Sequence, residues 1–237
     1  KDKFFILDLN NNLICFSLKD GSKIWNFNTE KPFINPLKKL SIVIENNLVI
    51  FNNSLGDITA VNIESGALEW QISTHNSDDL NEIISLKTSN LIIDENKIFF
   101  SNNKNVFYSL DLNTGNINWK QNISSSVKPA VIGDLLFTIS DNGYLFLIDK
   151  NRGNIVRIND IFKNFKPKVK KNLVPTGFIL DSNNLYVSTN FGKLLIVNIE
   201  NASTKEILKI GKGKLSRPFV KNQNLFLIKD NAIIKLN

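Results

Sequence analysis

Short runs of apolar residues alternate with polar turns along the whole chain. Six of these runs, each preceded by Asn, Asp or Lys, begin at residues 4, 48, 98, 135, 185 and 225, at intervals of 37 to 50 residues. The runs are rich in β-branched and aromatic residues, and Asn- and Gly-rich turns follow them, which is typical of strands joined by tight hairpins. No stretch shows the 3.6-residue apolar period of an amphipathic helix. The pattern therefore predicts an all-β protein with almost no helix.

Each run belongs to a larger unit with a constant order of strands. Second strands are predicted after the polar turns, at 13–18, 57–63, 106–111, 144–149, 193–199 and 232–236. Opening strands are predicted before five of the runs, at 40–45, 90–94, 129–133, 177–181 and 218–221. With a fourth strand after a further turn, the unit holds four antiparallel strands. This is the size and the strand order of a β-propeller blade.

Glycine and tryptophan recur at fixed positions after the second strand. A glycine closes the turn in four units, as Gly21, Gly66, Gly115 and Gly153. A tryptophan follows the first three glycines by four residues, as Trp25, Trp70 and Trp119. One sheet cannot cover its own two faces, and an indole buries about 150–250 Å². We therefore expect these residues to fill the space between neighbouring blades.

The repeats predict a single propeller domain over residues 1–237. Their approximate bounds are 1–30, 31–80, 81–126, 127–165, 166–213 and 214–237. The first repeat lacks an opening strand, the last holds three strands, and the sequence contains no methionine. Because an open ring would expose strand edges, we expect the chain to be the C-terminal part of a larger propeller, cut inside a blade. A six-repeat ring with irregular closure is the alternative.

The composition narrows the candidate chemistry. No apolar run reaches the ~18–20 residues of a membrane helix. The single cysteine, Cys15, excludes an internal disulfide and a Cys-based zinc cluster, and the single histidine, His75, excludes a multi-His metal site. Cys15 lies in an alternating strand, so we expect it to be a small buried apolar residue. His75 lies in a polar loop, where we expect it to be solvated.

The net charge of +7 is spread along the chain and favours acidic partners or anionic surfaces in general. The densest part is the basic run Lys163–Lys171. One interpretation is a solvated linker between blades. The other is a patch for an acidic partner domain or for anionic lipid headgroups. A nucleic-acid partner is not expected, because few aromatic residues are interleaved with the charges and no nucleic-acid motif is present.

Residues 60–70 and 109–119 carry the same motif, a strand followed by a glycine turn and a tryptophan. The motif resembles the repeat of quinoprotein (PQQ)-like propellers. The tryptophan is followed by Asn, Gln or Lys, and not by the Asp of a WD40 repeat. The motif weakens toward the C-terminus, where Arg157 stands in place of a fourth tryptophan and Asn201-Ala202 in place of a fifth glycine turn.

Within this superfamily, the last stretch, 216–234, is similar to the end of the BamB family of outer-membrane protein assembly factors. The polar excursion 73–85 also matches that family. The resemblance implies an eight-bladed ring, of which about six repeats are visible here. It further implies a non-catalytic scaffold lipoprotein in the periplasm, at the inner face of the outer membrane. Its N-terminal lipid anchor would not be present in this chain.

The resemblance also implies a partner, the POTRA domains of the insertase BamA, bound through two neighbouring interblade loops. The matching positions in the first loop are Ile34, Pro36 and Leu37, followed by Lys38 and Lys39, and those in the second are Ser85 and Lys87. The family's Arg in the first loop and its Asp-x-Asp pair in the second are absent here. Either other charges replace that contact, or these loops dock differently.

Two other classes of protein share the repeat. One is another protein- or ligand-binding propeller. The other is a fragment of a PQQ-dependent dehydrogenase. Resemblance to that class would imply a calcium site, an Asp base and often a vicinal Cys pair. The chain has no Cys-Cys pair, and no catalytic, metal-binding or cofactor-binding residues are recognisable at a characteristic spacing. We therefore expect no enzyme activity and no cofactor.

Overall fold

The computed structural model describes residues 2–31, 40–74, 88–102 and 105–236. Within these ranges the chain forms strands β1 to β22 in six antiparallel sheets, together with one short helix, α2 (Pro167–Lys170). Four of the sheets hold four strands, and the first and last hold three. The chain divides into two compact units, Lys1–Ser124 and Ser125–Asn237, with three sheets in each. The predicted all-β architecture of four-stranded antiparallel sheets is confirmed.

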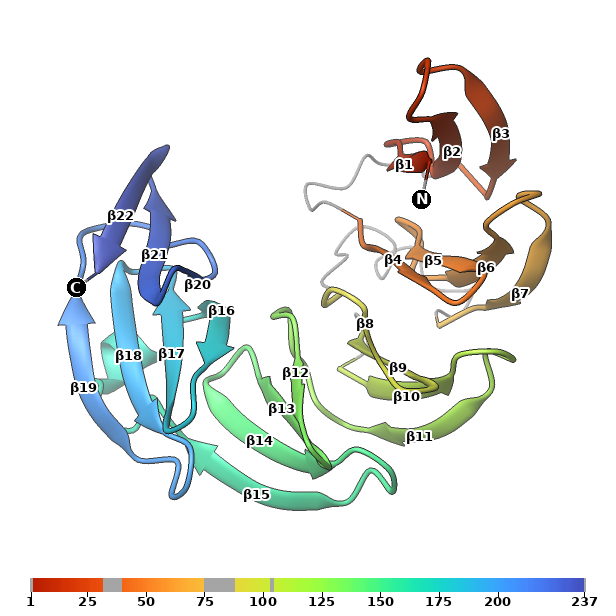
Figure 1. The fold of residues 1–237 in the computed structure, drawn as a ribbon. Helices are drawn as coiled ribbons and strands as arrows, with labels where there is room; N and C mark the ends of the chain where they lie inside the picture. Colours follow the sequence, from red (N-terminus) through yellow and green to blue (C-terminus); the bar gives the residue numbers. More distant parts are fainter. Residues whose placement is uncertain (1, 32–39, 75–87, 103–104, 237) are drawn as a thin grey trace. The chain divides into compact units, whose positions relative to one another are not determined.

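Unit 1 contains the first three sheets. Their strands are β1 (Lys3–Leu7), β2 (Asn12–Ser17) and β3 (Lys23–Asn28); β4 (Ile42–Glu45), β5 (Leu48–Asn52), β6 (Ile58–Asn62) and β7 (Leu68–Ile72); and β8 (Ile92–Asp94), β9 (Lys97–Ser101), β10 (Phe107–Asp111) and β11 (Ile117–Gln121). The first strands β4 and β8 lie on one side of the unit, and the last strands β3, β7 and β11 on the other (Figure 1).

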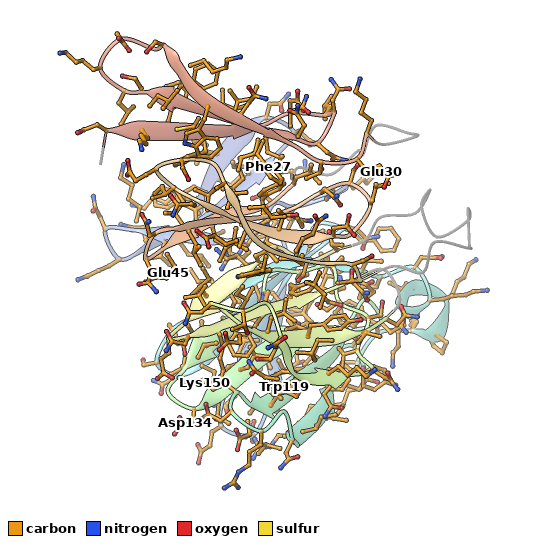
Figure 2. The ribbon with its side chains drawn as sticks, turned by 90° about the vertical axis from the view of Figure 1, so that its right-hand side faces the viewer. Phe27, Glu30, Glu45, Trp119, Asp134 and Lys150 are labelled. Atoms are coloured by element: carbon orange, nitrogen blue, oxygen red, sulfur yellow. The ribbon has the colours of Figure 1, made fainter. Side chains whose placement is uncertain are left out.

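Unit 2 contains the other three sheets. Their strands are β12 (Ala130–Ile132), β13 (Leu135–Ile139), β14 (Tyr144–Asp149) and β15 (Ile155–Asp160); β16 (Pro175–Leu180), β17 (Asn184–Thr189), β18 (Lys193–Asn198) and β19 (Thr204–Lys209); and β20 (Phe219–Lys221), β21 (Asn224–Lys229) and β22 (Ala232–Leu236). In each sheet the strands pair in chain order. The amide of Lys150 donates to the carbonyl oxygen of Asp134 (2.9 Å), and both residues lie at one end of the fourth sheet (Figure 2).

One turn recurs between the last two strands of the first five sheets. In four of them a glycine has a left-handed backbone, which favours glycine over other residues. These are Gly21, Gly66, Gly115 and Gly153, with φ of 72°, 71°, 72° and 77°. Each glycine amide donates to the carbonyl oxygen four residues earlier, at 2.8–3.0 Å. In the fifth sheet Ala202 takes this place with φ of 56°.

A β-bulge recurs in the same hairpins. The register shifts directly before one residue of the last strand, which is Trp25, Trp70, Trp119, Arg157 or Glu206. The cross-strand partners are, in the same order, Cys15, Ala60, Ser109, Leu147 and Ile196. A bulge re-aims a side chain, and a small residue stands opposite every tryptophan. In five sheets, therefore, a β-bulge at the same place sets the direction of the equivalent side chain in the last strand.

The core lies between neighbouring sheets, because both faces of the middle strands are buried. On β5, Val49 and Phe51 pack with Leu13 in the contact between the first two sheets, whereas Ile50 packs with Ile98 toward the third sheet. All five side chains are fully buried. Strands buried on both faces read as continuous apolar runs. This is why the run from residue 48 to 51 marked a strand in the sequence.

Candidate functional site

The residues proposed for partner docking lie outside the described residues. They are Ile34, Pro36, Leu37, Lys38 and Lys39 in segment 32–39, and Ser85 and Lys87 in segment 75–87. His75 belongs to the second segment as well. The structure does describe the residues that flank the two segments. These flanks show where each segment leaves the sheets and where it returns.

The C-terminal flanks of both segments meet at one side chain. Asn52, at the end of β5, is 2% exposed. Its Oδ1 accepts a hydrogen bond from the amide of Ser41 (2.6 Å), and its Nδ2 donates to the Oγ1 of Thr88 (3.1 Å). Ser41 Oγ in turn accepts from the amide of Leu91 (3.1 Å). A single buried asparagine thus ties together the ends of segments that are far apart in the sequence.

The N-terminal flank of the first segment is held by Asn11. The carbonyl oxygen of Asn11 accepts from the hydroxyl of Thr29 (3.1 Å), and its Nδ2 donates to the carbonyl oxygen of Glu30 (2.8 Å). Its Oδ1 accepts from the amide of Ser54 (2.9 Å), which belongs to the turn after β5. Asn11 is fully buried and has φ of 64°, a conformation that asparagine tolerates better than most residues.

The N-terminal flank of the second segment is held at the same turn. The hydroxyl of Thr74 donates to the carbonyl oxygen of Gly56 (2.6 Å), and Asn102 Nδ2 donates to the carbonyl oxygen of Thr74 (2.9 Å). The turn itself is organised by Asn53, whose Oδ1 accepts from the amide of Asp57 (2.9 Å) while its Nδ2 donates to the carboxylate of that residue (2.9 Å). All four flanks therefore converge on the end of β5 and the turn that follows.

We call this group the polar platform; it consists of Asn11, Asn52, Asn53, Ser54, Gly56 and Asn102. Glu30, whose carbonyl oxygen is bonded to Asn11, lies at the opposite end of the unit from Glu45, the last residue of β4 (Figure 2). Buried amide networks of this kind are costly to break, because a lost partner leaves a desolvated donor or acceptor. Two buried hydroxyl oxygens in the second sheet, Ser54 Oγ and Thr59 Oγ1, have no hydrogen-bond partner among the described residues.

Sequence reasoning missed the polar platform. The signal was a repeated polar pair at the end of the apolar run, as in Asn52-Asn53 and Ser101-Asn102. Asparagine at a strand end is most often a turn residue that bonds to its own backbone. Asn53 does so, but Asn52 and Asn102 reach across to other segments. Only the fold brings those partners together.

The motif residues of the first three sheets form direct contacts between neighbouring sheets. The indole N–H of Trp25 donates to the carbonyl oxygen of Ile63 (3.3 Å), and a Cβ added at Gly66 would lie 2.7 Å from the indole Cδ2. Trp70 repeats this arrangement. Its N–H donates to the carbonyl oxygen of Leu112 (3.1 Å), and a Cβ added at Gly115 would lie 2.6 Å from its Cε3. Each ring thus lies on the glycine turn of the next sheet.

The remaining motif residues are placed as follows. Trp119 is 9% exposed and stacks on Phe107, with ring centroids 6.1 Å apart. Gly153 adopts the recurring turn in the fourth sheet. Gly21 adopts it in the first sheet, but nothing lies within 4 Å of an added Cβ there. Gly21 therefore has the conformation of Gly66 and Gly115 without their aromatic neighbour.

The fourth sheet uses a different pair of residues. Arg157 occupies the position after the bulge, and its guanidinium donates to the carbonyl oxygen of Glu200 in the fifth sheet. Two residues later, Ala202 stands where the second and third sheets have glycine, and it is 3% exposed. A methyl group in this turn would collide with an indole lying as Trp70 does on Gly115. The loss of tryptophan and the loss of glycine therefore occur together.

Other candidate groups have structural surroundings. Cys15 is fully buried, and burial raises the pKa of its thiol. In the basic run, Lys163, Lys166, Lys168 and Lys171 are exposed, whereas Lys170 forms an ion pair with Asp160 and lies 5.8 Å from the ring centre of Tyr144. The run also contains helix α2. Among the described residues, no three His, Cys, Asp or Glu side chains gather as metal ligands would.

Comparisons with known proteins identify the class of this fold. The family model described as outer membrane protein assembly factor BamB matches residues 1–159. The crystal structure of BamB from Moraxella catarrhalis superposes with a TM-score of 0.60 at 16% identity, covering 99% of this chain and 81% of that one. None of the curated proteins that were compared matches the chain.

Two other solved structures superpose as well. The Cps50 (Swd1) β-propeller domain of Myceliophteria thermophila gives a TM-score of 0.60 at 10% identity, over 79% of this chain and 61% of that one. A chain of the Mitotic Checkpoint Complex gives 0.72 at 11% identity, over 99% and 70%. At such identities these likenesses show the fold alone.

The fold and the repeated turn therefore define a β-propeller of the quinoprotein (PQQ)-like type, as the sequence predicted. More narrowly, the family match covers well over half of the chain. The chain belongs to the family of the outer-membrane protein assembly factor BamB. No helix among the described residues is long and apolar enough to span a membrane.

Proposed function

We propose that the chain is a non-catalytic scaffold of the outer-membrane β-barrel assembly machinery. In this role it docks to the POTRA domains of the insertase BamA through segments 32–39 and 75–87. It acts in the periplasm, at the inner face of the outer membrane, where the family resemblance implies a lipid anchor. The match to an assembly-factor family supports the class of function.

One observation carries the docking proposal, which is the tie made by Asn52. Because this side chain bonds to both Ser41 and Thr88, the ends of the two segments are held at one place on the second sheet. Asn11 and Thr74 add ties to the turn after β5 at their other ends. Two segments with shared anchors can contribute to one contact surface, which neither would form alone.

The residues within the segments supply the chemistry of adhesion. Ile34 and Leu37 are apolar anchors, and Lys38 and Lys39 provide charge for an acidic partner surface. Buried apolar anchors contribute most of the affinity of an interface, while charges at its rim raise the rate of encounter and the specificity. The proposed mechanism therefore needs no covalent step.

Calorimetry with the purified POTRA domains tests this proposal, at low and at moderate salt. We expect saturable binding that weakens at least ~10-fold in Ile34→Asp or Leu37→Asp, because a buried carboxylate at an apolar contact is costly. The matched control is Leu68→Asp, which places the same charge at an exposed apolar position, 51% exposed, on β7.

Two outcomes contradict the proposal. One is no binding by a protein whose circular dichroism shows intact β-structure. The other is an equal loss of affinity in Leu68→Asp, which would mean that any added negative charge weakens a non-specific attraction. In either case two classes remain, another protein- or ligand-binding propeller and a dehydrogenase-like propeller. Titration with PQQ, followed by its absorbance, tests the second of them.

A further inference from the structure

The positive charge of the chain is concentrated in unit 2. Residues 125–237 hold 18 Lys and Arg against 8 Asp and Glu, a net charge of +10, whereas residues 1–124 hold 11 against 14, a net charge of −3. The net charge of +7 therefore comes entirely from unit 2. Much of it lies in two loops, 161–174 between β15 and β16 and 210–218 between β19 and β20, which contain no Asp or Glu.

The turn between β17 and β18 holds these two loops together. On one side, the amide of Asn190 donates to the carbonyl oxygen of Val174 (3.0 Å), and its Oδ1 accepts from the Val174 amide (2.9 Å). On the other side, the carbonyl oxygen of Gly192 accepts from the amide of Ile210 (2.9 Å), and a Cβ added at Gly192 would lie 2.3 Å from the carbonyl oxygen of Gly211. The two loops and this turn therefore form one continuous end of unit 2.

Buried apolar residues fix both loops to the sheets. In the first loop Ile161 and Phe162 are fully buried and Leu173 is buried as well, while Phe165 packs edge-on against Phe162 with ring centroids 5.8 Å apart. In the second loop Leu215 is fully buried. Because the apolar side chains turn inward, the charged ones remain outside, and four of the five lysines of the first loop are exposed.

Six lysines and one aromatic ring are exposed on this end of unit 2. Phe191, in the middle of the turn, is 41% exposed. None of the six lysines forms an ion pair with any residue that the structure describes. Helix α2 lies on this end, opposite the end that holds Asp134 and Lys150 (Figure 2). We call the group the lysine end, and it consists of Lys163, Lys166, Lys168, Lys171, Lys212, Lys214 and Phe191.

The composition of the lysine end favours a lipid surface over an acidic protein. Interfaces between proteins are enriched in arginine and depleted in lysine, because a guanidinium can hold a fixed carboxylate with two hydrogen bonds. A lipid surface has mobile headgroups, and each lysine near an anionic one raises the affinity about fivefold. An exposed aromatic ring beside the lysines suits the boundary between headgroups and acyl chains.

We propose that the lysine end of unit 2 binds the surface of a membrane that contains anionic lipids. The six lysines contact the headgroup phosphates, and Phe191 enters the interfacial layer. The contact uses residues of unit 2 alone. It does not depend on the polar platform or on the docking segments of unit 1, so the two proposals can fail separately.

Sedimentation with lipid vesicles tests the proposal, at about 0.1 M salt. We expect binding to phosphatidylcholine vesicles that contain about 30% phosphatidylglycerol, and no binding to pure phosphatidylcholine, because the attraction needs anionic headgroups. Replacing Lys166, Lys168 and Lys171 together by Gln should weaken binding about 100-fold, at about fivefold for each lysine. The matched control removes the same charge from exposed lysines at the opposite ends of β19, β20 and β22 and should weaken binding less than about fivefold; it replaces Lys205, Lys221 and Lys235 by Gln.

Phe191→Ser separates a membrane from an acidic protein, because soluble polyglutamate offers negative charge without an apolar layer. We expect this variant to bind anionic vesicles about 10-fold more weakly and to bind polyglutamate as the wild-type protein does. Val156→Ser, which removes an apolar side chain that is 60% exposed on β15, is the control and should leave vesicle binding unchanged. Every substituted side chain is exposed, so all variants should keep the wild-type thermal midpoint.

Three results overturn the proposal. The first is that anionic vesicles do not bind the folded protein. The second is that the control set of three lysines weakens vesicle binding as much as the set in the first loop, which would mean that the net charge alone is responsible. The third is that Phe191→Ser leaves vesicle binding unchanged while polyglutamate binds tightly, which would assign the lysine end to an acidic protein.

Discussion

The indole of Trp70 lies on Gly115, 45 residues further along the chain and in the next sheet, with its N–H bonded to the carbonyl oxygen of Leu112. The contact needs both residues. The glycine must have no side chain, since a Cβ would lie 2.6 Å from the ring, and its φ of 72° suits glycine as well. The Gly66–x–x–x–Trp70 motif thus takes part in two contacts. Its glycine accommodates the Trp25 ring of the preceding sheet, and its tryptophan packs on Gly115 of the next sheet.

Gly115→Ala should destabilise the protein by about 3 kcal/mol, because the new methyl group meets the Trp70 ring in a backbone conformation that also disfavours alanine. Gly21→Ala is the matched control. It has the same φ of 72° but nothing within 4 Å, so backbone strain alone should cost it about 1 kcal/mol. Urea unfolding followed by tryptophan fluorescence measures both. Equal losses would mean that the ring contact contributes nothing.

Arg157→Trp should destabilise the protein when Ala202 is present and should be tolerated better together with Ala202→Gly. The reason is that the methyl group of Ala202 stands where an indole would lie. In a double-mutant cycle we expect a coupling free energy of about 1 kcal/mol in favour of the Trp–Gly pair. Additive effects of the two substitutions on the unfolding free energy would show that an indole at position 157 does not pack on the turn at position 202.

Asn52→Ala should lower the free energy of unfolding by about 2–4 kcal/mol, because it leaves the buried amide of Ser41 and the hydroxyl of Thr88 without this partner. If the docking proposal is right, the variant should also bind POTRA domains more weakly under conditions where it is fully folded. Asn26→Ala, which removes an exposed amide on β3, serves as the control. Unchanged stability in Asn52→Ala would contradict a role for this side chain in holding the ends of the two segments together.

Acid should reduce the stability of the turn between β14 and β15, because protonation of Asp149 removes the carboxylate that holds this turn. The backbone amides of Arg152 and then Asn151 donate to this carboxylate and lower its pKa. A lowered pKa contributes stability above the pKa of an unfolded Asp, about 3.9, and the contribution is lost as the pH falls through the folded value. Asp149→Asn keeps an acceptor, as Asn62 does in the second sheet. Its deficit in urea midpoint at pH 7 should therefore shrink at pH 3.

Cys15 should be unreactive toward a thiol reagent at pH 8 while the protein is folded. The side chain is fully buried opposite Trp25, and burial raises the pKa of the thiol, so little accessible thiolate is present. Complete reaction is expected in denaturant. Cys15→Ala should cost about 1 kcal/mol, the loss of one buried sulfur. Fast labelling of the folded protein would show that the first sheet opens readily.

The strands were predictable from the sequence, and the contacts between them were predictable only in part. The predicted strands 144–149 and 232–236 coincide with β14 and β22. Short apolar runs between Asn- and Gly-rich turns are typical of β-strands, so the local pattern was enough to predict them. Short helix α2 was not expected within the basic run, where Pro167 begins a single turn that ends at Lys170. The local pattern also gave no way to tell which glycine each tryptophan covers.

The candidate site shows the limit more clearly. Asn52 and Asn11 read as ordinary turn residues in the sequence, because their partners lie 36 and 43 residues away, at Thr88 and Ser54. Long-range polar contacts follow from the fold and leave no local signature.

The contact between Trp25 and Gly66 has a consequence for how this chain can be divided. The bounds of a sequence repeat do not coincide with the bounds of this contact. A repeat that ends after its tryptophan is separated from the glycine on which that ring packs, because the glycine belongs to the next repeat. A cut at residue 30 would separate Trp25 from Gly66, whereas a cut within the β6–β7 hairpin would break hydrogen bonds between its two strands. In unit 1 the smallest piece that retains a complete contact spans two neighbouring sheets. Swapping single repeats between related propellers should therefore fail unless the glycine turn of the following repeat is exchanged along with them.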